Sequence, residues 1–128
     1  MRVLIVEDST VLAGRIAELI RSLAGIELTN TVDNEAEALH SLATAPPDVV
    51  ILDLHLRTGS GFGVLRSMSR SAHPRPKIIV LTGFDLAEYR REAESFGVEA
   101  FLNKSRDYHR LPSLLRDLAG QTPPQKES

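Results

Sequence analysis

The chain has 128 residues, of which 42% are hydrophobic and 25% charged, as expected for one globular domain. Its formal charge of −2 indicates neither a nucleic-acid-binding surface nor attraction to an anionic membrane. The lack of cysteine excludes disulfides and thiol chemistry, and no apolar run approaches the ~20 residues of a membrane span. The first apolar stretch is too short for a signal peptide, so we expect a cytoplasmic protein.

The amino-terminal segment predicts a buried strand followed by a helix. Residues 3–6 form an unbroken apolar run, typical of a strand covered on both faces, and they end at Glu7 and Asp8. Either Asp8 or Ser9 can cap the next helix, in which apolar residues recur at three- and four-residue spacing. Gly25 is expected to end this helix.

The next two predicted strands differ in their pattern. Residues 26–32 alternate apolar and polar side chains, which favours a strand near the edge of a sheet. Asn34 can cap a second helix, which the two prolines Pro46–Pro47 end. Residues 48–54 are almost continuously apolar, which predicts a strand in the middle of a parallel sheet. Asp53 stands where this strand leaves the core, before a Gly/Ser/Thr-rich loop, so a ligand can reach its carboxylate.

The second half of the chain continues the alternation. A third helix over residues 62–68 must end before Pro74, and residues 77–82 form a third buried-type strand that ends in the hydroxyl of Thr82. A fourth helix over residues 86–96 is predicted to have one apolar face. The residues of that face are Leu86, Tyr89, Ala93 and Phe96.

The carboxyl-terminal part predicts one more strand and helix. Residues 100–102 form a short strand that ends near Lys104, and a leucine-rich helix follows in which Pro112 fits the first turn. The polar, proline-containing residues 120–128 are expected to form a flexible tail. The predicted domain is therefore residues 1–119.

Five strands alternating with five helices predict a single α/β domain, whose parallel strands are joined by right-handed crossovers. In such sheets ligands bind beyond the carboxyl ends of the strands, near the point where the strand order reverses. Polar side chains stand at four of these strand ends. They are Glu7, Asp8, Asp53, Thr82 and Lys104.

These residue types favour phosphoryl chemistry with a metal ion. Three carboxylates placed close together repel one another unless a cation lies among them, and hard oxygen ligands suit Mg²⁺, which also binds phosphate oxygens. Lys104 adds a positive charge and Thr82 a hydrogen-bond donor for a phosphoryl group. Asp53 can then act as a nucleophile that forms an acyl phosphate.

One combination of motifs is specific: Glu7-Asp8, Asp53-Leu54-His55-Leu56 with Gly61 beyond it, Thr82-Gly83, and Phe101 three residues before Lys104. In this combination the chain resembles the receiver domain of bacterial two-component response regulators, the CheY-like family, over about residues 2–119. The resemblance implies a flavodoxin-like (βα)5 fold, a doubly wound parallel sheet with strand order 2-1-3-4-5.

The resemblance also implies roles for the acidic residues. Asp53 would accept a phosphoryl group from a sensor histidine kinase or a histidine phosphotransfer protein. Glu7 and Asp8 would bind Mg²⁺ together with Asp53 and the backbone carbonyl of His55. The domain would be a signalling module rather than an enzyme, with Mg²⁺-dependent self-phosphorylation and autodephosphorylation as its only chemistry.

A switch is implied as well. The hydroxyl of Thr82 would move toward the phosphoryl group, and the ring of Phe101 would turn inward behind it. The surface of the fourth helix, fifth strand and fifth helix would then change its preference for a downstream protein or a second copy of the chain. No direct nucleic-acid partner is expected.

Three positions depart from the family pattern. Ser105 stands where a proline after a cis bond is usual, Arg57 where a proline is frequent, and Phe101 lacks the hydroxyl of a tyrosine. None of them removes a group that the site needs. We also expect the side chains of His55 and Phe84, each two residues past a key position, to control the access of water to the acyl phosphate.

Other classes fit less well. A haloacid-dehalogenase-like phosphohydrolase needs a second aspartate where His55 stands, and an FMN binder needs a phosphate loop where Glu7-Asp8 would repel phosphate. No output domain follows residue 119, so the chain is either a single-domain regulator or a receiver fragment of a longer one. The remaining histidines lack metal-ligand spacing and are predicted to lie on the surface: His40, His73 and His109.

Overall fold

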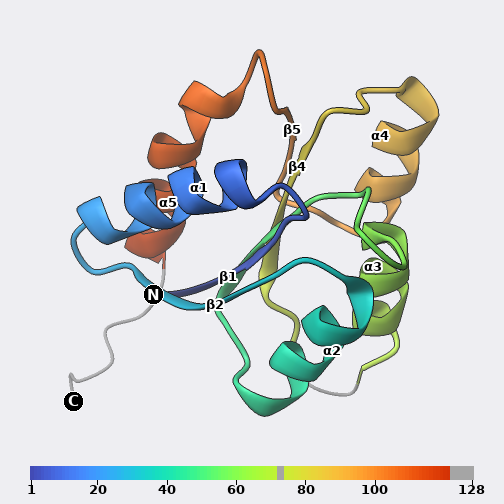
Figure 1. Ribbon diagram of the computed structural model, residues 1–128, viewed down its shortest axis with the longest axis horizontal. Coiled ribbons are helices and arrows are strands. Elements are labelled where there is room, and N and C mark those ends of the chain that lie inside the picture. Colours follow the sequence, from blue (N-terminus) through green and yellow to red (C-terminus); the bar gives the residue numbers. More distant parts are fainter. Residues whose placement is uncertain (72–73, 122–128) are drawn as a thin grey trace.

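The computed structural model describes residues 1–71 and 74–121, in which five strands alternate with five α-helices (Figure 1). The strands are β1 Arg2–Val6, β2 Glu27–Val32, β3 Val49–Leu52, β4 Lys77–Thr82 and β5 Ala100–Asn103. The helices are α1 Thr10–Ser22, α2 Glu35–Thr44, α3 Gly61–Ser69, α4 Ala87–Ser95 and α5 Leu111–Gln121, with a 3-10 turn, η1 Tyr108–Arg110, before the last.

The sheet is parallel throughout and has the order β2-β1-β3-β4-β5, which confirms the expected topology. The central strand β3 pairs with β1 on one side and β4 on the other, and all four of its residues are buried. β2 lies at the edge and is mostly exposed or half-buried, as its alternating sequence predicts. Its register with β1 shifts between Val3 and Leu4.

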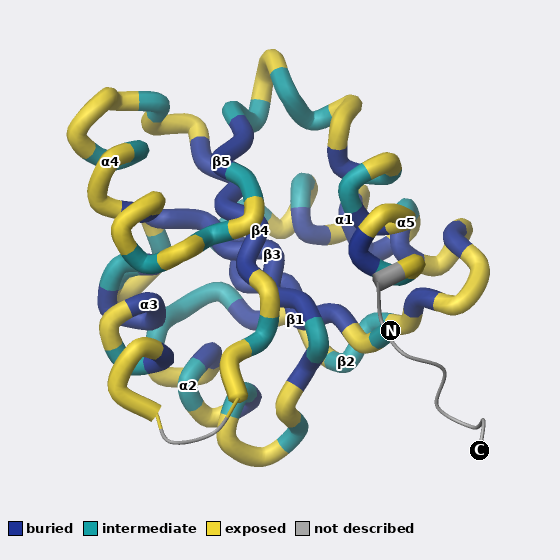
Figure 2. The backbone as a smooth tube through the Cα atoms, turned by 180° about the vertical axis from the view of Figure 1, so that it is seen from behind, coloured by how far each residue is buried: buried dark blue, intermediate teal, exposed yellow. Residues whose placement is uncertain are grey.

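Helices cover both faces of the sheet, and they divide the core into two layers (Figure 1). On one face, α1 and α5 pack their apolar side chains against alternate residues of the strands, such as Ile5 and Ile51. On the other face, α2, α3 and α4 pack against the intervening residues, such as Val6 and Leu52. Figure 2 shows the buried strands at the centre and the outer sides of the helices exposed.

Side-chain caps fix where three of the helices begin. The hydroxyl of Ser9 accepts a hydrogen bond from the backbone N–H of Leu12, so Ser9 rather than Asp8 caps α1. Asn34 caps α2, as the sequence predicts, and Ser60 caps α3. Asp8 is therefore not used as a helix cap.

Helix α4 differs from the prediction at its first residue. Leu86 precedes the helix and is 46% exposed, whereas it was expected on the apolar face. Ala93 is fully buried and both Tyr89 and Phe96 are half-buried, so the rest of that face is as predicted. The helix ends at Ser95, and Gly97, two residues later, has a positive φ of 78° that favours glycine.

The last helix begins at Leu111 with Pro112 in its first turn and extends to Gln121, past the expected boundary at residue 119. Residues 122–128 of the expected tail lie outside the described residues. His40 and His109 are exposed, as predicted, and His73 lies outside the described residues. None of the helices in residues 1–71 and 74–121 combines the length and apolar character that a bilayer crossing requires.

Candidate functional site

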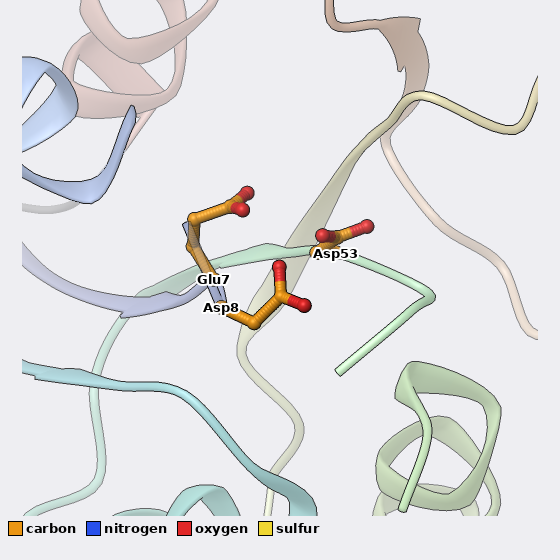
Figure 3. A group of neighbouring side chains, drawn as sticks. All are labelled: Glu7, Asp8 and Asp53. Atoms are coloured by element: carbon orange, nitrogen blue, oxygen red, sulfur yellow. The ribbon is translucent and has the colours of Figure 1, made fainter. Parts of the chain in front are cut away.

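The acidic residues meet at the carboxyl edge of the sheet because the strands that carry them are neighbours. Val6 pairs with Leu52 at the ends of β1 and β3, and Asp53, the residue that follows β3, donates its backbone N–H to the carbonyl of Val6 at 2.9 Å. Glu7, Asp8 and Asp53 each place a carboxylate oxygen within 4.8 Å of the others (Figure 3). The sequence prediction that these carboxylates lie together is therefore confirmed.

Lys104 reaches the acids from the end of β5. Its backbone N–H donates to the carbonyl of Thr82 at 2.9 Å, which fixes it beside the end of β4. Its Nζ then donates to Oε2 of Glu7 and Oδ2 of Asp53, each at 2.9 Å. Because β4 lies between β3 and β5, this side chain crosses the end of a strand to reach its partners.

The cluster combines three carboxylates with one ammonium group, that of Lys104, and two of the carboxylates are buried. Glu7 is 3% and Asp53 2% exposed, and burial raises the pKa of Glu7 to about 7 although hydrogen bonds from Lys104 and Ser9 act to lower it. Burial would lower the pKa of Lys104, but its hydrogen bonds to Asp53 and Glu7 outweigh that effect and raise it. A divalent cation would relieve this imbalance, and carboxylate oxygens are the ligands that Mg²⁺ prefers.

Thr82 and Phe101, the two residues expected to switch, lie on adjacent strands. Thr82 ends β4, is fully buried, and its hydroxyl oxygen accepts the backbone N–H of Phe84 at 3.2 Å. Phe101 is 5% exposed, and the guanidinium carbon of Arg90 lies 4.6 Å from the centre of its ring. The aromatic ring thus has the inward position in this structure.

His55 and Phe84 come from different loops but contact each other. Their rings stack with centroids 3.7 Å apart and planes inclined by 23°. The backbone N–H of His55 donates to Oδ1 of Asp53 at 3.2 Å, which places the stacked pair next to that carboxylate. The two residues expected to shield the site therefore form one unit beside it.

Other contacts restrain the loops at Ser105 and Arg57, the two positions where the family usually has proline. Every peptide bond of residues 1–71 and 74–121 is trans, including the one that joins Lys104 to Ser105. The side chain of Asn103 accepts the backbone N–H groups of Ser105 and Arg106 at 2.8 and 3.0 Å, which holds the loop after Lys104. Arg57 pairs with Asp33 at 3.0 Å, so an ion pair restrains the loop after Asp53.

Asp85 is a residue of this region that the sequence did not suggest. Its carboxylate accepts hydrogen bonds from Arg90 at 3.3 Å and from Arg106, and so connects the β4–α4 and β5–α5 loops. Arg90 in turn covers the ring of Phe101. Arg106 is distant from Asp85 in the sequence, and Arg90 follows it by five residues, which is not the three- or four-residue spacing of a helical pair. No sequence signal therefore marks this network.

The fold and the site define a flavodoxin-like α/β protein with clustered acids, a hydroxyl and a lysine beyond the carboxyl edge of its sheet. The family model described as "Response regulator receiver domain" matches residues 3–116, which is most of the chain. The chain belongs to the response regulator receiver domain family. This membership favours the receiver over the phosphohydrolase and the FMN binder as the interpretation of the site.

Relatives and solved structures agree with this assignment. The "Protein-glutamate methylesterase/protein-glutamine glutaminase 5" of Myxococcus xanthus is 30% identical over 104 residues, which cover 81% of this chain and 30% of that protein. The corresponding protein 1 of Paramagnetospirillum magneticum is 31% identical over 120 residues, which cover 94% and 30%. A LuxR-family DNA-binding response regulator from Staphylococcus aureus superposes with a TM-score of 0.82 at 27% identity, covering 92% of this chain and 98% of that one.

The proteins that this chain resembles differ in their activities and partners. This chain spans only 30% of the length of the two methylesterase relatives, whose named enzyme activities belong to those longer proteins. A receiver is a signalling domain that acts with histidine kinases and output domains. The expectation of no nucleic-acid partner lacks support, because the similar Staphylococcus aureus protein is a DNA-binding regulator.

Proposed function

We propose that Asp53 is the phosphoacceptor of this receiver domain and that Mg²⁺ binds beside it. The observation that carries the proposal is the position of the Asp53 carboxylate, which is almost fully buried yet in contact with Lys104 and within 4.8 Å of the other two acids. A carboxylate with this environment has a place for a cation on one side and an ammonium group on the other.

The proposed reaction is a phosphoryl transfer from a phosphohistidine of a sensor kinase or phosphotransfer protein. A carboxylate oxygen of Asp53 attacks the phosphorus atom, the P–N bond breaks, and the released imidazole takes up a proton from solvent. Lys104 neutralises charge on the phosphoryl oxygens. A bound Mg²⁺, held by Glu7, Asp8, Asp53 and the His55 carbonyl, would neutralise the rest.

We further propose that phosphorylation changes the contacts of Thr82, whereas the ring of Phe101 already has its inward position. The Thr82 hydroxyl would exchange its bond with the Phe84 N–H for one with a phosphoryl oxygen, as an interaction with an anionic acceptor is stronger. The surface of α4, β5 and α5 would then bind a downstream protein or a second copy of the chain. The receiver boundaries at residues 1–119 and the cytoplasmic location stay predictions.

Phosphorylation by a small acyl-phosphate donor with Mg²⁺ tests the proposal. We expect the intact mass of the protein to increase by one phosphoryl group, and the Asp53→Asn variant to show no increase. Asp117→Asn is the matched control, because Asp117 is an exposed aspartate of α5 and its amide should leave labelling unchanged. Labelling that persists in Asp53→Asn would overturn the assignment.

A further inference from the structure

The loop after Asp53 is paired with the loop that precedes α2. The backbone N–H of Arg57 donates to the carbonyl of Asp33 at 3.2 Å, and the N–H of Glu35 donates to the carbonyl of Thr58 at 3.1 Å. These backbone bonds, together with the Arg57–Asp33 ion pair, join the β2–α2 and β3–α3 loops. Residues far apart in the sequence thus form one structure beside the acidic cluster.

The side chain of Glu35 is packed into the centre of this structure. Its Oε1 accepts the backbone N–H of Ser60 at 3.0 Å, at the amino terminus of α3, where a negative charge is favourable. A Cβ atom at Gly59 would lie 2.5 Å from the Glu35 side chain, and one at Gly63 would lie 2.3 Å from Oε2. The glycines therefore leave the space that this carboxylate fills.

A short series of contacts connects Glu35 to the phosphoacceptor. Ser60, which Glu35 binds, forms an antiparallel bridge with His55. The N–H of His55 donates to Oδ1 of Asp53. Glu35 is thus separated from Asp53 by two intervening residues, and it touches neither the acids nor any group that reacts.

We propose that Glu35 is a positioning residue for the metal ion, because it fixes the loop that supplies the His55 carbonyl. The inference rests on the proposed function, in which this carbonyl is a ligand of Mg²⁺. Groups that hydrogen-bond metal ligands typically change metal affinity by ~10–100-fold when removed. Glu35 acts through one further residue, so we expect an effect of about tenfold, at the lower end of that range.

Titration of the full chain with MgCl2, followed by the NMR shifts of the His55 and Ser60 amides, tests the inference. Glu35→Ala should bind Mg²⁺ about tenfold more weakly than the wild type, whereas Glu35→Gln, which keeps an oxygen acceptor for Ser60, should stay within about twofold. Glu37→Ala is the matched control, since it removes an exposed acid from the same turn of α2 and should bind as the wild type does.

A second variant keeps the inference testable if Glu35→Ala does not fold. Gly63→Ala retains the Glu35 carboxylate but places a methyl group in its space, so it should weaken Mg²⁺ binding in the same direction. If Glu35→Ala binds Mg²⁺ as tightly as the wild type, the inference is overturned while the proposed metal site stands. If Glu35→Ala does not fold, unchanged Mg²⁺ affinity in Gly63→Ala has the same meaning. If the amide signals of His55 and Ser60 in the wild type do not shift when Mg²⁺ is added, both the inference and the proposed metal site are overturned. A lower thermal unfolding midpoint with unchanged Mg²⁺ affinity would show a structural role only, and so also overturn it.

Discussion

The two loops on either side of the acidic cluster are held in different ways. The β3–α3 loop is joined to the β2–α2 loop by backbone hydrogen bonds, by the half-buried carboxylate of Glu35 and by the exposed Arg57–Asp33 ion pair. The β4–α4 loop, residues 83–86, is held by the side chain of Asp85 and exposes Phe84 and Leu86 by nearly half. The two arginines that bind Asp85 are 40% and 69% exposed, and ion pairs with exposed partners contribute little to stability because water competes for those partners. The side of the site that would hold a cation is thus built in advance, whereas the side that would switch is easily rearranged.

This difference matches the tasks proposed for the two loops. A metal site needs ligands at fixed positions, and each additional restraint on the loop lowers the cost of ordering them on binding. A switch needs two arrangements of similar free energy, and contacts that exchange readily with water keep the difference between them small. Thr82 connects the sheet to the loop that would switch, since its hydroxyl oxygen accepts the backbone N–H of Phe84 in the β4–α4 loop.

The largest expected effect comes from the glycine at the start of α3. A Cβ atom at Gly61 would lie 2.3 Å from the carbonyl oxygen of Asp53 and 2.8 Å from the Cα of Leu54, both backbone atoms that cannot move independently. Gly61→Ala should lower the free energy of unfolding by about 2–3 kcal/mol, as overpacking does. Urea unfolding followed by circular dichroism measures this change.

The matched control is the glycine of the other loop. A Cβ atom at Gly83 would come no closer than 4.0 Å to Lys104, so Gly83→Ala should change the free energy of unfolding by less than about 0.5 kcal/mol. Equal effects of the two substitutions would contradict the distinction between a tightly packed and an open loop.

The next effect is a pH dependence caused by Glu7. The pKa of Glu7 is raised from 4.5 to about 7 in the folded protein, so folding favours the protonated acid. The contribution of protonated Glu7 to the stability of the fold is complete below about pH 4.5 and is lost as the pH rises through about 7. Without divalent cations, the free energy of unfolding of the wild type should therefore fall by about 2 kcal/mol relative to that of Glu7→Gln as the pH rises from 5 to 8.

Urea unfolding in EDTA at each pH measures this difference. Glu37→Gln, an exposed acid of α2, is the control and should follow the wild type. Saturating Mg²⁺ should reduce the pH dependence of the wild type, because a cation favours the charged form of Glu7. A wild type and a Glu7→Gln variant with parallel pH profiles would show that burial does not affect this acid as described.

The smallest expected effect concerns the stacked rings of His55 and Phe84. If they restrict the access of water, the double variant His55→Ala/Phe84→Ala should lose its phosphoryl group about three- to tenfold faster than the wild type. Leu86→Ala, which shortens an exposed side chain of the same loop, is the control. The decay of the phosphorylated mass with time gives the rates, and equal rates in all three proteins would exclude shielding.

The main features of the fold and site follow from local sequence patterns. Unbroken apolar runs such as Val49–Leu52 are buried strands, and the polar residues after them meet because parallel strands end at one edge. The strand order itself came from the resemblance in the motifs around Asp53 and Lys104. Apolar runs depend only on neighbouring residues, and the family motifs have fixed residue types at fixed positions. Both can therefore be recognised in the sequence without the structure.

The features that the sequence could not predict depend on how loops approach one another. Glu35 and Asp85 look like ordinary surface acids, and their partners become visible only when the β2–α2, β3–α3, β4–α4 and β5–α5 loops are in place. Leu86 has helical spacing but precedes the helix: its carbonyl accepts the N–H of Arg90, while its own backbone is extended, with φ −93° and ψ 143°. Both Asp8 and Ser9 are good capping residues, and only the observed bond to Leu12 decides between them.

The pairing of Asp53 with β1 has a consequence for how the protein unfolds locally. Its N–H bonds to Val6 at the end of the central strand pair, so releasing this backbone requires opening the middle of the sheet. Segments held by the core open only with the whole molecule, whereas weakly held loops open independently. We therefore expect the amide proton of Asp53, the proposed phosphoacceptor, to be among the last to exchange with solvent, and the amide protons of the β4–α4 loop to be among the first.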